Sequence, residues 1–464
     1  MQFKPYFSRQ TSFGWFVIIL IGIMVRSDHL GVTSIVRELS LTSAAYNSMI
    51  HFFRAKSWYI EQLRQAWINI VKNCPFLIKE DNRNIIIGDG VKAAKEGRKM
   101  PGVSKLHQES DNSAKGEYIH GHMFGGLAVL CGLGDKLFGI LLSLKIHSGI
   151  GAIQKWCFEG YNKVDSHIVK MIIDAGEAIK ILGASILLLD RLYLTRPMLE
   201  AAKRIPKLTV VTKAKRNATA YNYPEPYKGR GRKAKKGSSV KLWDFFTTCA
   251  EQFMTETIQV YGKNTQVRYY CIDLLWGKGL YFPLRFILTE YNGTKGILAS
   301  TDLTLLPSQI IRLYSYRFKI ECSFRELKQV VAGFSYHFWS KAMLKLKKFK
   351  SNAENQAALE SITDPRAKEL IANTVKAIEG YAQIGIIALG LLQLAGLMFG
   401  NDINRSGNRF MRTVSSSTPS ERTTADFMRK NIYQLFRFLP DLPLTTIISS
   451  KQIIEDIPIN RNTA

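Results

Sequence analysis

Four polar residues in the second half of the chain have a spacing that could support phosphodiester chemistry. Within the segment YSYRFKIECSFRELK they are Tyr314, Arg317, Glu321 and Lys328. At about 100° per residue, a helix places these side chains within roughly 60° of arc. A carboxylate on this face can bind a metal ion, and the flanking cations can bind phosphates. A solvated, salt-bridged helix face is the alternative interpretation of the same residues.

The residues around this motif predict one uninterrupted helix. Pro307 suits the first helical position, Thr304 lies just upstream, and the next twenty residues contain no Gly or Pro. An apolar stripe beside the polar face is formed by Leu313, Ile320, Phe324 and Leu327. We therefore expect the polar face to lie at the edge of a core.

The composition favours a polyanionic partner. Lys and Arg number 64 against 37 Asp and Glu, which gives a formal net charge of +27 over 464 residues. Nucleic acid is the commonest polyanion, although a membrane surface would attract the same excess. Six cysteines without CxxC pairs indicate reduced thiols in a cytosolic protein, with neither a zinc site nor a disulfide framework.

Two apolar runs are interpreted as buried helices of a soluble protein. Residues 13–25 form a run too short to span the hydrocarbon core and lack a signal-peptide cleavage site. Residues 384–399 are interrupted by Gln393. No membrane protein is predicted.

Residues 1–75 have the pattern of short helices. They are compatible with a helix-turn-helix that binds DNA through Arg54, Lys56 and Arg64, and equally with any small helical bundle.

The next region has an α/β pattern. Residues 84–88, 118–133 and 136–146 are expected to be strands, the last two joined by a Gly134-Asp135 hairpin turn. A helix over residues 165–182, with Asp165 or Ser166 as its N-cap, and a buried strand leading to Asp190 follow. Asp89 is expected to end the first of these strands.

Residues 207–295 depart from this alternation. Residues 209–211, 267–274 and 281–289 look like strands of a separate β region. Residues 213–241 hold ten Lys or Arg and a single acid, Glu225, so we expect a flexible basic loop that contacts phosphates. Its central cations are Arg230, Arg232, Lys233, Lys235 and Lys236, and a solubilising loop is the alternative.

Together these residues resemble the DDE transposases of the insertion-sequence-4 type, whose signature is a Y-R-E-K motif. The resemblance runs from about residue 85 to residue 339. It includes IIIGDGVKAAKEGRKMPGV around Asp89, GHMFGGLAVL on the second strand and LLLDRLYLT around Asp190. The Y-R-E-K spacing is fairly specific, whereas each aspartate alone is a weak signal.

The resemblance implies an α/β ribonuclease H-like core with a β-rich insertion, flanked by helical regions. It implies Asp89, Asp190 and Glu321 as catalytic ligands of two Mg²⁺ ions, with Mn²⁺ able to substitute. It also implies that Tyr314, Arg317 and Lys328 contact the DNA backbone. Two positions depart from the family pattern. Gly90-Val91 stand where a Thr or Ser usually follows two residues after the first acid, and Leu192 stands where a small residue usually precedes the aromatic residue.

Other polar residues compete for the site. Asp273 and Asp302 end or interrupt strands, and Asp302 could lie near the triad. His120 and His122 alternate on one strand face and could bind a metal, although a structural or DNA-contacting role is favoured.

The sequence therefore predicts four regions and one leading function. A helical DNA-end-binding domain spans residues 1–75, the catalytic domain residues 76–207 and 296–350, the insertion residues 208–295, and a helical region residues 351–464. We expect a cytoplasmic enzyme that binds the ends of a mobile element, cleaves DNA and joins it to a target, synapsing the ends as a homodimer. A catalytically decayed or domesticated DNA-binding protein and a nuclease on the same fold are the alternatives.

Overall fold

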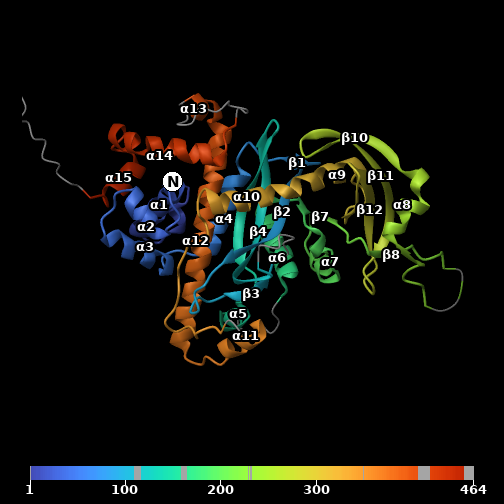
Figure 1. The fold of residues 1–464 in the computed structure, drawn as a ribbon, viewed down its shortest axis with the longest axis horizontal. Coiled ribbons are helices and arrows are strands. Elements are labelled where there is room, and N and C mark those ends of the chain that lie inside the picture. The colour runs from blue at the N-terminus through green and yellow to red at the C-terminus, as the bar shows by residue number, and fades with distance from the viewer. Residues whose placement is uncertain are drawn as a thin grey trace, which may run out of the picture. The chain divides into compact units, whose positions relative to one another are not determined.

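The computed structural model describes residues 2–108, 116–157, 165–227, 229, 232–347, 350–405 and 418–453. The chain forms two compact units (Figure 1). The first contains Met1–Ala66, Glu96–Val103 and Arg325–Ala464, and the second contains Trp67–Lys95 and Ser104–Phe324.

One large mixed sheet organises the second unit, with helices alongside it. Over the described residues its strands are β1 (Lys79–Glu80), β2 (Arg83–Ala94), β3 (Ser104–His107), β4 (Tyr118–Leu133), β5 (Lys136–Ile146), β6 (Ser185–Leu188), β7 (Leu208–Lys213), β8 (Thr219–Tyr221), β9 (Ser239–Lys241), β10 (Met254–Val260), β11 (Lys263–Trp276), β12 (Phe282–Tyr291) and β13 (Thr294–Ser300). The path through the sheet is β3-β4-β2-β6-β7-β13-β12-β11-β8-β9, with β1, β5 and β10 paired to β2, β4 and β11.

Five strands form the centre of this sheet. β5, β4 and β2 are antiparallel to one another, and β2, β6 and β7 are parallel. Helix α6 (His167–Leu182) connects β5 to β6 and contacts β4 and β2, while α7 (Arg196–Ala202) connects β6 to β7. β4 and β5 are almost wholly buried, which explains their long apolar runs. An α/β architecture follows.

Several sequence predictions are confirmed in this region. β4 and β5 have the expected bounds, and Gly134 in the turn between them has a φ of 58°, a conformation that glycine adopts readily. Ser166 caps α6 by accepting a hydrogen bond from the backbone N–H of Val169 at 3.4 Å.

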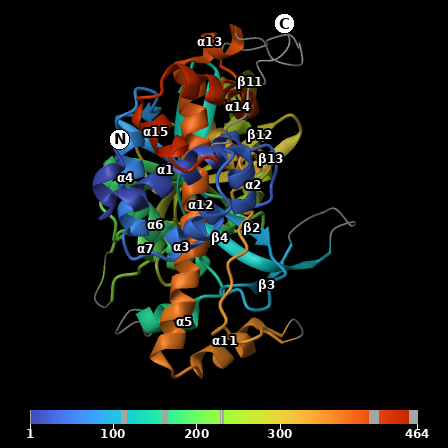
Figure 2. The ribbon, with the colours of Figure 1, turned by 90° about the vertical axis from the view of Figure 1, so that its left-hand side faces the viewer.

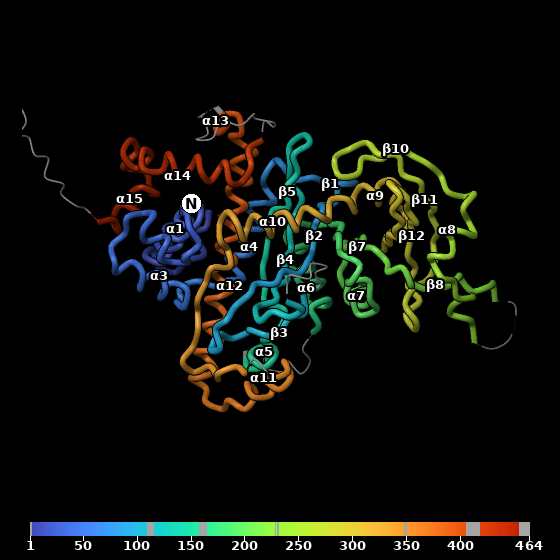
Figure 3. Tube along the Cα trace, viewed as in Figure 1, coloured from blue at the N-terminus to red at the C-terminus, as the bar shows by residue number. Residues whose placement is uncertain are grey.

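Two predictions about strands are wrong. The first strand does not end at Asp89, because β2 continues to Ala94 in register with β4. Residues 209–211 do not belong to a separate β region, because β7 pairs in parallel with β6 and antiparallel with β13. The strands after β7 therefore extend the core sheet, as the trace in Figure 3 shows.

The first unit is helical and built around one long helix. Its elements include α1 (Gln10–Val25), α2 (Val32–Glu38), α3 (Ala44–Arg54), α11 (Asn352–Glu360), α12 (Pro365–Met398), α13 (Gly400–Arg405), α14 (Glu421–Phe438) and α15 (Pro443–Ser449). α12 packs against α1, α3 and α14 (Figure 2). α4 (Ile60–Lys72) begins in this unit and ends in the other.

The two apolar runs are buried helices, as expected. Residues 13–25 lie in α1, and residues 384–398 lie in α12. Among the described residues, α12 alone is long and apolar enough to cross a membrane, and 83% of its apolar window is buried inside the fold. Such burial is typical of the core helix of a soluble protein.

Candidate functional site

The pairing of β2 with β6 brings Asp89 and Asp190 to one edge of their shared ladder. The parallel register ends at the pair Ile87 and Leu188. Asp89 and Asp190 each lie two residues beyond this pair. Because residues two apart in extended chains point to the same face, we interpret the two carboxylates as neighbours. The charge of Asp190 accordingly raises the pKa of Asp89.

Asp190 stands at a turn that the structure holds by two hydrogen bonds. It precedes the short 3₁₀ helix η2 (Arg191–Tyr193). Its carbonyl oxygen accepts from the backbone N–H of Tyr193 at 3.0 Å and from the hydroxyl of Thr212 at 2.9 Å. Thr212 lies on β7, so the turn is tied to the neighbouring strand.

Glu321 comes from a helical segment that is not one helix. α9 (Pro307–Ser315) is followed by the 3₁₀ turn η5 (Tyr316–Phe318) and then by α10 (Lys319–Gln329). The prediction of an uninterrupted helix is therefore wrong. At the break, the hydroxyl of Ser315 donates to the carbonyl oxygen of Arg312 at 2.7 Å, a local bond that competes with regular helix hydrogen bonding. Pro307 is confirmed at the first helical position, but the residue before the helix is Leu306.

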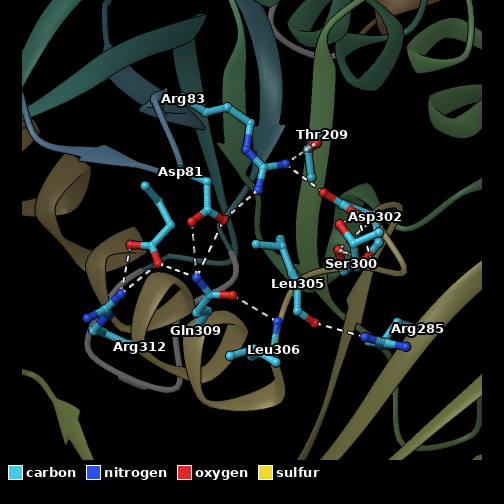
Figure 4. A network of polar contacts seen from close by, with 12 residues as sticks. Asp81, Arg83, Thr209, Arg285, Ser300, Asp302, Leu305, Leu306, Gln309 and Arg312 are labelled. Carbon is cyan, nitrogen blue, oxygen red and sulfur yellow. Dashed lines mark hydrogen bonds and ion pairs between the residues drawn. The ribbon is translucent and has the colours of Figure 1, made fainter.

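A polar network anchors α9 to β1 and to the turn between β1 and β2 (Figure 4). Arg312 donates to both oxygens of Glu80 at 2.7 Å, and Gln309 donates to the same carboxylate at 2.7 Å. Nearby, Arg83 bonds Asp302 at 2.6 Å. These contacts hold α9 in place. α9 leads directly into η5, which carries Arg317, and then into α10, which carries Glu321.

Arg317 joins two of the three predicted acids. Its guanidinium bonds Asp89 at 3.2 Å and also donates to Glu321. The side chain of Arg317 is 15% exposed, against 22% for Asp89 and 42% for Glu321. The pairing holds Glu321 at the same edge of the sheet as Asp89.

The electrostatics of this cluster are those of a buried carboxylate near other charges. Burial, and to a smaller extent the charges of Asp190 and Glu321, raise the pKa of Asp89, Arg317 lowers it, and the net value is about 6. The pKa of Arg317 is lowered by burial, but the charges of Asp89 and Glu321 outweigh this and raise it overall. Arg317 is therefore a fixed cation among acids that repel one another.

Two tyrosines enclose the cluster. Burial raises the pKa of Tyr314, and the acids Asp190 and Asp89 add to the effect. The pKa of Tyr193 is raised for the same reasons. Both phenols thus stay neutral beside the carboxylates.

Lys328, the fourth residue of the motif, belongs to the first compact unit. It follows Glu321 on α10, and the boundary between the two units falls before Arg325. The structure thus brings together Asp89, Asp190, Glu321, Arg317 and Tyr314 within the second unit.

The competing acids have structural partners. Asp273 forms a two-point ion pair with Arg285 at 2.8 Å for each bond. Asp302 pairs with Arg83 and accepts from Thr304. Neither pairs with the predicted triad, so the expectation that Asp302 lies near it receives no support. His122 is fully buried against Phe124, with 5.9 Å between ring centroids.

No preformed metal cage is visible in the described part of the chain. There, no group of three or more His, Cys, Asp or Glu side chains has an arrangement that could hold a metal ion. At the triad, the Arg317 guanidinium occupies the space between Asp89 and Glu321.

The prediction of one flexible loop over residues 213–241 is wrong, because β8 and β9 lie within this range. The basic loop proper joins β8 to β9 at the far end of the sheet. β9 lies seven strands from β2 along the sheet path, or about 34 Å at roughly 4.8 Å per strand. Arg230 lies outside the described residues. The described cations of the loop are Arg232, Lys233, Lys235 and Lys236. Lys236 lies 4.3 Å from the ring centroid of Tyr221, and Lys233 lies 5.9 Å from that of Tyr227.

One predicted DNA contact in the N-terminal helices is wrong. Arg64 is 3% exposed and pairs with Glu379 of α12 at 3.0 Å. It also donates to Gln383 at 3.3 Å. These contacts make Arg64 part of the core. Lys56 pairs with Glu369, and Arg54 donates to the carbonyl oxygen of Trp339.

Sequence reasoning missed three polar residues beside the site. His147, His167 and Asp174 form a hydrogen-bonded chain that reaches Tyr193. The available signal was the pair of glycines in GHMFGGLAVL. A side chain at Gly125 would overlap the His147 ring, so this glycine indicates a bulky neighbour.

Comparison of the chain with protein-family models, with curated proteins and with solved structures gave no match.

Proposed function

We propose that this chain is a transposase of the DDE type, built on a ribonuclease H-like core. The observation that carries the proposal is the convergence of Asp89, Asp190 and Glu321 at one edge of the sheet, with Arg317 paired to two of them. The central strands support the same core. Three antiparallel strands are followed by two parallel ones, with a helix before each parallel strand.

The chemistry of the cluster suits hard divalent cations. Carboxylate oxygens are the ligands that Mg²⁺ prefers. Burial, with smaller contributions from the charges of Asp190 and Glu321, raises the pKa of Asp89, and a bound cation would favour its ionised form. Asp89, Asp190 and Glu321 would hold two Mg²⁺ ions, or Mn²⁺ in their place, only after a rearrangement that removes Arg317 from between Asp89 and Glu321. When bound, these ions activate a water or a 3′-hydroxyl and stabilise the leaving oxygen.

Arg317 is suited to exchange partners during the reaction. Its planar fork can bind a phosphate at two points as it now binds carboxylates. In the structure it compensates part of the charge of Asp89 and Glu321. A scissile phosphate at this edge would be an alternative anionic partner for Arg317, and the guanidinium would orient that phosphate. Tyr314 and Lys328 are proposed as further contacts to the DNA backbone.

The partners follow from the charge and the reaction. A net charge of +27 suits double-stranded DNA, both the element ends and the target. The basic loop, far along the sheet from the acids, would bind DNA away from the cleaved bond. Two ends must be brought together, so we propose a homodimer acting on DNA in the cytoplasm.

A cleavage and joining assay separates the candidate functions. Labelled DNA carrying the flanks of the element is incubated with the protein and Mg²⁺, with and without target plasmid. A transposase nicks at the element end and produces joined product. A nuclease on the same fold cleaves without joining. A decayed DNA-binding protein shifts the DNA in a gel but leaves it intact in both Mg²⁺ and Mn²⁺, and this result would overturn the proposal.

A further inference from the structure

A chain of four side chains runs from the second predicted metal ligand into the core. The hydroxyl of Tyr193 lies 2.7 Å from Nε2 of His167. Nδ1 of His167 lies 2.8 Å from Nδ1 of His147, and Nε2 of His147 lies 2.8 Å from Asp174. At the inner end of this hydrogen-bonded chain, Nζ of Lys145 lies 3.0 Å from the other carboxylate oxygen of Asp174.

The chain is largely buried, and the backbone makes room for it. Tyr193, His147 and Asp174 are 3%, 4% and 8% exposed. A Cβ on Gly125 would overlap the His147 ring, and a Cβ on Gly90 would lie 3.0 Å from Nε2 of His167. Gly125 and Gly90 pair with each other across β4 and β2. The two glycines next to Asp89 therefore accommodate the two imidazoles.

The carboxylate at the inner end fixes one proton of the hydrogen-bonded chain. Nε2 of His147 faces the Asp174 carboxylate and therefore carries a proton. The two Nδ1 atoms of His147 and His167 face each other, so one of them donates and the other accepts. At its other nitrogen, Nε2, His167 bonds the hydroxyl of Tyr193. Both ring nitrogens of each histidine are thus occupied by hydrogen bonds.

The outer end of the chain is joined to Asp190 through the backbone. Tyr193 closes the 3₁₀ turn that Asp190 begins, and its N–H donates to the carbonyl oxygen of Asp190 at 3.0 Å. A tyrosine ring held at its hydroxyl cannot rotate out of the core without breaking the chain. The turn that carries Asp190 is thus restrained at two points, by the backbone hydrogen bond from Tyr193 to Asp190 and by the bond between the Tyr193 hydroxyl and His167.

We propose that Tyr193 is a positioning residue for Asp190, anchored by His167, His147 and Asp174. The proposal rests on the transposase function, because it assigns the chain to the metal-binding edge. Outer groups that orient metal ligands typically contribute about 10- to 100-fold to metal affinity. Tyr193 acts here through the turn and does not itself bind the metal.

Tyr193→Phe tests this role because it removes the hydroxyl and keeps the ring. Mn²⁺ binding to the full-length protein is measured by electron paramagnetic resonance without DNA, together with ¹⁵N spectra of the histidines. We expect about 10-fold weaker Mn²⁺ binding, a changed His167 Nε2 signal, and unchanged affinity for end DNA. Tyr269→Phe is the matched control, since Tyr269 is also buried and donates to Glu256 at 2.8 Å, far from the acids. It should leave Mn²⁺ binding unchanged.

The outcomes separate this proposal from the function on which it rests. If Tyr193→Phe binds Mn²⁺ like the wild type, and the wild type loses binding on Asp190→Asn, the positioning role is refuted and the transposase proposal stands. If Asp190→Asn also leaves Mn²⁺ binding unchanged, Asp190 is no metal ligand and both proposals fail.

Discussion

Replacing Asp89 with asparagine should stabilise the metal-free protein at neutral and alkaline pH. Folding raises the pKa of this carboxyl to about 6 from its ordinary value of 3.8. The folded state therefore favours the protonated acid. This favourable contribution is present below pH 3.8 and is lost as the pH rises through 6. Asparagine imitates the protonated carboxyl at every pH.

The size of the effect follows from the difference between the two pKa values of Asp89, 3.8 and about 6. One unit of pKa shift corresponds to about 1.4 kcal/mol, so ionisation of Asp89 lowers the free energy of unfolding by up to about 3 kcal/mol at pH 8. At about pH 4.5 the loss is only about 1 kcal/mol. The attraction of Arg317 already contributes to the pKa and needs no separate allowance. For a unit of this size, 3 kcal/mol corresponds to a melting temperature higher by about 5–10 °C.

Melting temperatures of Asp89→Asn and wild type, measured in EDTA at both pH values, check this reasoning. The difference should favour the variant and should grow from pH 4.5 to pH 8. Asp273→Asn is the control of opposite sign, because it leaves Arg285 without its two-point partner and should lower the melting temperature. A variant that melts at or below the wild-type temperature at pH 8 would refute the raised pKa of Asp89 in the folded protein. Adding Mg²⁺ should stabilise the wild type and narrow the gap.

Two further predictions concern DNA. Neutralising the four described cations of the basic loop to glutamine should weaken DNA binding and reduce the slope of log affinity against log salt by up to about 4, since each phosphate contact contributes about 0.9. An unchanged slope in salt titrations would identify the loop as a solvated tether. Arg317→Ala should lower single-turnover cleavage more than end affinity, and Arg317→Lys should restore little, because a point charge does not replace a two-point fork. Normal cleavage by the folded fraction, with only a lower melting temperature, would show that Arg317 merely holds α10 in place.

The features set by local pattern could be predicted from the sequence. β4 and β5 are long apolar runs around a glycine turn, and α6 begins at a serine cap, so their bounds follow from neighbouring residues alone. Glu321 was predicted from the spacing of the Y-R-E-K motif, whereas Asp89 and Asp190 were predicted from the family resemblance of the segments around them. The structure places them at one edge through the β2 and β6 register and through Arg317.

The features that depend on distant residues could not be predicted. β7 joins the core sheet because it pairs with β6 and β13, and neither partner can be predicted from the six residues of β7. Arg64 lies on an amphipathic helix like a surface cation, yet its partner Glu379 is 315 residues away. The histidine chain near Asp190 likewise joins the residue after β5 to α6 and η2 through contacts that no local spacing reveals.

Single-turnover cleavage of end-bearing DNA by three proteins tests the central claim most directly. Wild type, Asp190→Asn and Glu321→Gln are compared with Mg²⁺, and end binding is measured on the same preparations by gel shift. The account predicts cleavage by the wild type and none by either variant, with end binding retained, because metal coordination needs the carboxylate charge whereas binding draws on distant cations. Cleavage by either variant at a near-wild-type rate would contradict it.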